Sequence, residues 1–130
     1  MLKQLLLVVS LVSFSFSPLA VRAEEGETSV TAEKIEVTIV GEVINPICYL
    51  DHNGRGLEHM SCAESSISTG IPLAILEDDT EFIYLAVTAE HKPANEQLHP
   101  FLAQRVQVQG KLMEGNGLTV IEVEQVKLAT

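Results

Sequence analysis

Two segments of this chain alternate strictly between apolar and polar residues, and this pattern constrains the fold more than any other feature. They cover residues 34–44 and 105–113. Because successive side chains of a β-strand point to opposite faces, each segment predicts a strand with one buried face. Gly41 lies within the first segment, and a glycine inside a strand is typical of a bulge or bend where a sheet curls. The predicted buried side chains are those of Ile35, Val37, Ile39, Val43, Val106, Val108 and Leu112.

Three further apolar segments complete a predicted five-stranded sheet. Residues 71–76 and 81–89 flank an acidic turn and predict a hairpin whose second strand is apolar on both faces and therefore central. Residues 118–126 predict the last strand. Five strands with a short helix between the third and fourth indicate an all-β, OB-fold-like barrel, with an open antiparallel sheet as the alternative. The helix stripe consists of Leu98, Phe101 and Leu102, and the predicted core of the last strand consists of Leu118, Val120, Ile121 and Val123.

A cysteine-bearing insertion separates the first two predicted strands. Asn45-Pro46 ends the first strand, and residues 51–56 are rich in the Asp, Asn and Gly residues that favour turns. Apolar residues then recur at helical spacing, so residues 57–69 predict a short helix with Gly70 as its cap. The apolar residues of that helix are Leu57, Met60, Ala63 and Ile67.

The N-terminus has the pattern of an export signal. Lys3 precedes an apolar run of about twelve residues, and Val21-Arg22-Ala23 provides a small-residue cleavage site. The run is shorter than the roughly twenty residues that span a bilayer, so we expect cleavage and no stable membrane insertion. We therefore expect a periplasmic or secreted protein with a signal peptide at residues 1–23, a disordered acidic leader at 24–33 and an OB-fold-like domain at 34–128.

The charge of the chain excludes one class of partner. Loss of Lys3 and Arg22 with the signal leaves six basic against eighteen acidic residues, a net charge of -12. Such a surface repels phosphate backbones, so we expect no nucleic-acid partner and instead an unknown protein or small ligand. Neither a G-x-S-x-G elbow nor an S-x-x-K pair is present, so we expect no enzyme activity.

Two cysteines and two histidines of the insertion carry the clearest chemical signal. Their spacing is C-x3-H-x6-H-x2-C, from Cys48 through His52 and His59 to Cys62. Thiolate and imidazole ligands suit zinc or copper, with Cys48, His59 and Cys62 as the main ligands and His52 as the fourth. In a helix over residues 57–69, His59 and Cys62 would share one face. Alternatively, export would let the cysteines form a disulfide, which closes a loop of about 15 residues and stabilises the fold by about 3 kcal/mol. The two alternatives exclude each other.

Three short motifs resemble those of small exported bacterial domains that are predicted to be OB-fold-like. The patterns are G-x-V-x-D-x-x-C-Y, H-x-x-C-A-x-x-x-C and G-x-P. Here they match Gly41-Glu42-Val43-Ile44-Asn45-Pro46-Ile47-Cys48-Tyr49, His59-Met60-Ser61-Cys62-Ala63 and Gly70-Ile71-Pro72. The resemblance implies a redox or metal site at Cys48, His59 and Cys62. Asn45 stands where the pattern has Asp, and Ser66 stands where it has a third cysteine. The loss of that soft ligand favours the disulfide.

These observations predict an exported, non-catalytic OB-fold binding or interaction module with a Cys48–Cys62 disulfide. The alternative is a periplasmic protein that binds zinc, copper or a cofactor through Cys48, His59 and Cys62. In both cases we expect the ligand or partner beside the insertion, because loops displayed on a rigid scaffold carry function. The predicted binding residues are Tyr49, Met60 and Ser66.

Overall fold

The computed structural model describes residues 33–130, so the predicted signal and residues 24–32 of the predicted leader lie outside the described residues. The five strands are β1 (Ile35–Ile44), β2 (Ala74–Glu77), β3 (Ile83–Val87), β4 (Arg105–Gly115) and β5 (Leu118–Leu128). The helices are α1 (Pro46–His52), α2 (Met60–Ile67) and α3 (Asn95–Leu98), with short 3-10 turns η1 (Leu57–His59) and η2 (His99–Phe101).

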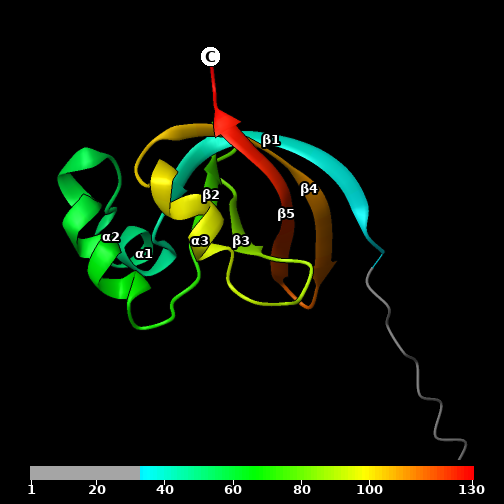
Figure 1. The fold of residues 1–130 in the computed structure, drawn as a ribbon, viewed down its shortest axis with the longest axis horizontal. Coiled ribbons are helices and arrows are strands. Elements are labelled where there is room, and N and C mark those ends of the chain that lie inside the picture. Colours follow the sequence, from blue (N-terminus) through cyan, green and yellow to red (C-terminus); the bar gives the residue numbers. More distant parts are fainter. Residues whose placement is uncertain (1–32) are drawn as a thin grey trace, which may run out of the picture.

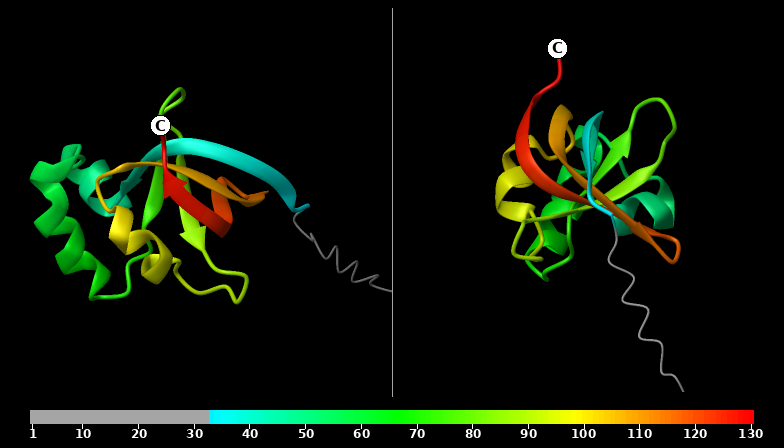
Figure 2. Two further views of the ribbon diagram at one scale, coloured as in Figure 1. Left: turned by 45° about the horizontal axis from the view of Figure 1, so that its top comes forward. Right: turned by 90° about the vertical axis from the view of Figure 1, so that its right-hand side faces the viewer.

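The five strands close into a barrel, which confirms the predicted all-β, OB-fold-like architecture. The strand order around the barrel is β1-β2-β3-β5-β4, and β4 closes it by pairing with β1. All neighbours are antiparallel except β3 and β5, which are parallel. As predicted, α3 lies between the third and fourth strands. Figures 1 and 2 show α1 and α2 together at one end of the barrel, with the start of β1 at the other end.

The core follows the alternation of the two diagnostic segments. Ile39 and Val43 of β1 and Val106 and Val108 of β4 are buried in one cluster with Ile121 of β5. Leu98 and Leu102 join this cluster from α3 and the segment after it, so the helical connection is held by apolar packing. A second cluster forms between β1 and β2, and it consists of Ile44, Ala74 and Leu76.

Two strand glycines let neighbouring backbones approach closely. A Cβ at Gly41 would lie 2.1 Å from the Leu76 carbonyl oxygen, and one at Gly110 would lie 2.1 Å from that of Glu122. No side chain fits at either distance. Gly41 therefore allows β1 and β2 to lie in close contact. The irregularity in strand register lies elsewhere, between Gln109 and Gly110 of β4.

Several predicted boundaries and core positions differ from the structure. The insertion contains a helix, α1, that was not expected, because Asn45-Pro46 starts a helix as well as ending a strand. The predicted helix over 57–69 is instead a 3-10 turn followed by α2 and a turn. Leu118 was predicted to be in the core but is 52% exposed, because it begins β5 at the β4–β5 turn. Ile35, at the start of β1, is exposed as well.

Candidate functional site

The backbone of α1 fixes the position of Cys48. Asn45 is the N-cap, and its side-chain oxygen accepts hydrogen bonds from Ile47 N at 2.9 Å and Cys48 N at 3.1 Å. Pro46 occupies the first turn, where its missing N–H costs nothing. The helix ends at Asn53, which adopts a left-handed conformation with φ 55°. Cys48 is therefore held in the first turn of α1.

Cys62 occupies the equivalent place in the second helix. α2 begins at Met60, so Cys62 is its third residue. One turn later, Ser66 Oγ donates to the Cys62 carbonyl oxygen at 3.2 Å. The two thiols thus come from the first turns of two separate helices.

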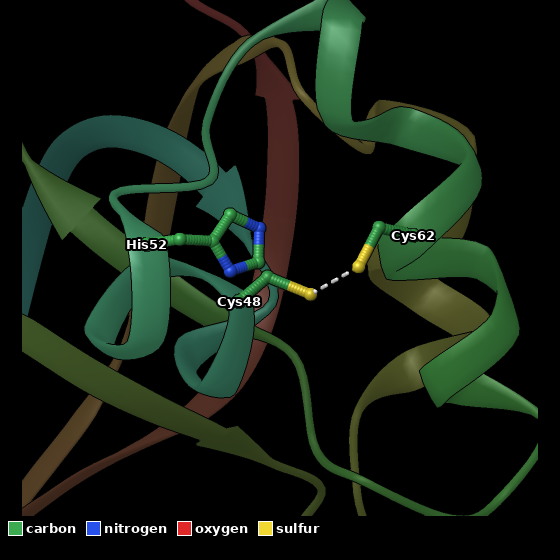
Figure 3. A group of neighbouring side chains, drawn as sticks. All are labelled: Cys48, His52 and Cys62. Carbon is green, nitrogen blue, oxygen red and sulfur yellow. Dashed lines mark hydrogen bonds between the residues drawn. The ribbon is translucent and has the colours of Figure 1, made fainter.

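The two sulfur atoms point toward each other across the space between α1 and α2 (Figure 3). Cys48 Sγ and Cys62 Sγ lie 2.8 Å apart, and both residues are free thiols. Cys48 is buried with 5% exposure, whereas Cys62 is partly exposed. The pair is close enough for disulfide formation or for shared coordination of one ion.

His52 completes a group of three donors. One ring nitrogen of His52 and the sulfurs of Cys48 and Cys62 all lie within 4.8 Å of one another. Nδ1 of this ring lies 3.1 Å from a carboxylate oxygen of Asp51. A carboxylate on one ring nitrogen orients the imidazole and leaves the other nitrogen as a ligand. Asp51 was not among the predicted site residues, and its place beside the histidine in the sequence was the available signal.

Gly54 lies in close contact with both Cys48 and His52. Its N–H donates to the Cys48 carbonyl oxygen at 3.0 Å. A Cβ at Gly54 would lie 3.0 Å from His52 Nε2 and 3.1 Å from the Cys48 Cβ. The lack of a side chain therefore allows the histidine and the cysteine to pack against the same short turn.

His59 takes a different place from the one predicted. The sequence prediction ranked it ahead of His52 as a ligand, but the three-donor group contains His52. The physical reason is that α2 starts at Met60, so His59 is the last residue of η1 with non-helical φ -102° and ψ 5°. It does not share a helical face with Cys62. Its ring packs beside His52 instead, with ring centroids 5.4 Å apart.

The three predicted binding residues have separate surroundings. Tyr49 packs against the cluster of Ile44, Ala74 and Leu76, and Met60 packs against the main core. Ser66 lies near Cys48, and its hydroxyl favours the thiolate form of that residue. Only Ser66 of the three is therefore placed beside the sulfur pair.

Burial controls the protonation of Cys48. Loss of water around the sulfur raises the pKa of the Cys48 thiol above its ordinary value of 9.0, and the neighbouring Cys62 raises it further. The Ser66 hydroxyl partly opposes this shift of the pKa. In the metal-free protein, Cys48 is accordingly a neutral thiol at pH 7.

A small cavity adjoins the site but does not accommodate a cofactor. Its volume is about 10 Å³, and Asn45, Gly54, His59 and Met60 are among the residues that line it. Asn45 is 1% exposed, and within residues 33–130 its Nδ2 group has no hydrogen-bond acceptor. A cavity of this size holds about one water molecule. The three-donor group of Cys48, His52 and Cys62 is not part of the lining of this cavity.

Comparisons with protein-family models, with curated proteins and with solved structures found no match to this chain. Over residues 33–130, the structure has no helix with the length and apolar character needed to cross a membrane.

Proposed function

We propose that this protein is an exported, non-catalytic binding module whose functional centre is a metal site formed by Cys48, His52 and Cys62. The observation that carries the proposal is the convergence of three donor atoms within 4.8 Å from two different helices. Thiolate and imidazole ligands select thiophilic ions, so we propose zinc or copper. Export rests on the predicted signal, and the site we propose is therefore periplasmic or secreted.

The donor set fits such an ion with a small rearrangement. Tetrahedral coordination with metal–sulfur distances of about 2.3 Å places two sulfurs about 3.8 Å apart. The sulfurs of Cys48 and Cys62 lie at 2.8 Å, so coordination requires them to separate by about 1 Å. Two thiolates and one imidazole leave a fourth position for water, for a ligand or for a group of a partner protein.

The surface of α1 supports a partner at this end of the barrel. Ile47 and Leu50 are three residues apart on α1 and are 55% and 71% exposed. Apolar side chains exposed beside polar ligands are typical of binding surfaces. A partner that covers α1 would also exclude water from the fourth coordination position.

A second candidate is the interaction module with a Cys48–Cys62 disulfide. The observation that favours it is the sulfur separation of 2.8 Å, since a disulfide bond requires an approach to about 2.05 Å. A disulfide would close a loop of about 15 residues and stabilise the fold by about 3 kcal/mol. Because it consumes both thiolates, this state and the metal-bound state exclude each other.

Metal analysis distinguishes the two candidates. Protein purified without chelator should contain zinc or copper at close to one equivalent, and reduced apo-protein should bind either ion in a competition titration against a chromophoric chelator. Cys48→Ser, Cys62→Ser and His52→Ala should each weaken binding by at least about tenfold, because each removes one ligand. His99→Ala is the matched control. His99 is exposed, lies in η2 and pairs with Glu64, and it is not one of the three donors. Stoichiometric disulfide with no metal uptake after reduction would overturn the metal site in favour of the second candidate.

A further inference from the structure

We infer that Cys48 and Cys62 form a thiol–disulfide exchange pair that reacts with small disulfides, with Cys62 as the attacking residue and Cys48 as the resolving residue. This reaction goes beyond metal binding and uses the same two sulfur atoms. A bound ion therefore blocks it, and the metal-free protein is the reactive form.

The first argument is the unequal exposure of the two thiols. Cys62 is partly exposed at the start of α2, whereas Cys48, within α1, is 5% exposed. An external disulfide in solution can therefore reach Cys62 without movement of the barrel. The Cys48 sulfur points toward Cys62 (Figure 3) and belongs to an almost fully buried residue, so an external disulfide does not reach it directly.

The second argument is the orientation of the two sulfurs. They point toward each other from the first turns of α1 and α2 (Figure 3). The Cys48–Cys62 bond of the second step therefore forms between groups that already face each other.

The third argument is proximity for the second step. Once Cys62 has formed a mixed disulfide, the Cys48 sulfur lies next to the bond that must be broken, because the two sulfurs are only 2.8 Å apart in the reduced protein. Attack within one molecule competes well with attack by a second molecule, because no translational freedom is lost. The mixed disulfide is therefore short-lived in the wild type.

The reaction balances as follows. The Cys62 thiolate attacks one sulfur of a disulfide RS–SR, the S–S bond breaks, and one RS⁻ leaves. Cys48 then loses its proton to the solvent and attacks Cys62 Sγ as a thiolate, the Cys48–Cys62 bond forms, and the second RS⁻ leaves and is protonated. The two protein thiols lose two electrons and two protons in total, and the small disulfide gains both to give two RSH molecules. The exchange is stoichiometric, since a further reductant is needed to regenerate the thiols.

Trapping experiments on the full chain test the order of attack. The reduced protein is mixed with glutathione disulfide in the presence of a chelator, quenched with acid, alkylated and analysed by intact mass. Wild type should lose two hydrogens without accumulating an adduct, Cys48→Ser should accumulate one glutathione adduct on Cys62, and Cys62→Ser should form its adduct at least about tenfold more slowly.

Controls separate reactivity from loss of structure. Both variants should retain the far-UV circular dichroism of the wild type, and in 6 M guanidinium their single thiols should react with glutathione disulfide at similar rates, because unfolding removes the difference in exposure. Equal adduct rates for the two folded variants, or a stable adduct on the wild type, would overturn the inference. Because the chelator removes metal ions throughout, the result does not depend on whether the metal site exists.

Discussion

Asn45 Oδ1 accepts a hydrogen bond from Cys48 N at 3.1 Å, so the residue that follows β1 also fixes the first turn of the helix that presents the buried thiol. We predict that Asn45→Ala lowers the free energy of unfolding by about 1–2 kcal/mol, because it leaves the buried Cys48 N–H and the part-buried Ile47 N–H without their acceptor. Urea unfolding at pH 7 measures this loss. The same variant should increase the rate at which iodoacetamide alkylates Cys48 in the native protein.

Asn45→Asp is the control for this interpretation. An aspartate keeps the acceptor oxygen and removes the Nδ2 group, which has no acceptor among the described residues. A carboxylate at a helix N-terminus also interacts favourably with the helix dipole. Asn45→Asp should therefore lose less stability than Asn45→Ala. If the two variants lose the same amount, capping is not what Asn45 contributes.

Much of the barrel could be predicted because its strands have a regular period of two. The alternation over residues 34–44 and 105–113 is carried by long strands that are buried on one face, so the pattern survives folding. In the last strand, β5, the sequence pattern is a poorer guide to which residues are buried. Leu118 is 52% exposed at the β4–β5 turn, and Glu122 is buried with its carboxylate paired to Lys34, so neither follows the rule that apolar residues are buried and charged residues are exposed.

The sequence predicted the residues from which the site is built, but not which histidine joins the two cysteines. The sequence brings Cys48, His52, His59 and Cys62 into one insertion, and the structure places three of them together. Selection between the two histidines depended on where α2 begins, and helix boundaries are uncertain by one or two residues. A shift of the start from residue 57 to Met60 moves His59 off the face that carries Cys62. Recognition of Asn45-Pro46 as a helix start would have placed His52 in the same helix as Cys48.

The close approach of β1 and β2 at Gly41 gives a second prediction. A methyl group there would lie 2.1 Å from the Leu76 carbonyl oxygen, so β1 and β2 would have to separate. Gly41→Ala should therefore lower the free energy of unfolding by at least about 2 kcal/mol. Gly115→Ala is the matched control, because a Cβ at Gly115 meets no atom within 4 Å, and its unfolding free energy should stay within about 0.5 kcal/mol of wild type. Similar effects of the two substitutions would contradict the close-approach role of Gly41.

The pairing of Glu122 with Lys34 predicts a pH dependence of stability. Lys34 Nζ lies 2.7 Å from the Glu122 carboxylate, and this hydrogen bond lowers the pKa of Glu122 below its ordinary value of 4.5. Because the folded pKa is the lower one, the stabilisation is complete above pH 4.5 and is lost as the pH falls through the folded value. Glu122→Gln should therefore lose less stability between pH 7 and pH 3 than wild type does, as measured by urea unfolding at each pH.

Glu124→Gln controls for the general effect of removing a carboxylate from β5. Glu124 is exposed and pairs with Lys111 at 2.8 Å, and exposed ion pairs contribute little to stability. Its pH dependence should match that of wild type. An equal flattening in both variants would assign the effect to net charge and not to the buried position of Glu122.

The predicted export signal can be tested on the protein recovered from its producing cells. We expect the mature chain to begin at Glu24, because Val21-Arg22-Ala23 provides the small-residue cleavage site. Intact mass and N-terminal sequencing measure this directly. A double variant that carries Arg22→Pro and Ala23→Arg should not be cleaved, and the longer chain should be recovered. A mature protein that retains Met1 would contradict the predicted signal at residues 1–23.

Gly54 allows a test of the metal site that substitutes none of the three ligand residues. A Cβ at Gly54 would lie 3.0 Å from the Cys48 carbonyl oxygen, 3.0 Å from His52 Nε2 and 3.1 Å from the Cys48 Cβ, so Gly54→Ala should shift the imidazole and Cys48 relative to each other. Since a misplaced ligand weakens coordination, the affinity for zinc or copper(I) should fall by about tenfold or more. The competition titration that measures this also applies to Gly115→Ala, which should bind as wild type does.

Because Gly54 N also donates to the Cys48 carbonyl oxygen, urea unfolding of the apo-protein must accompany the titration. A loss of affinity in a variant that remains folded indicates that the turn at Gly54 positions the ligands for binding, whereas unchanged affinity in Gly54→Ala would contradict this role of Gly54.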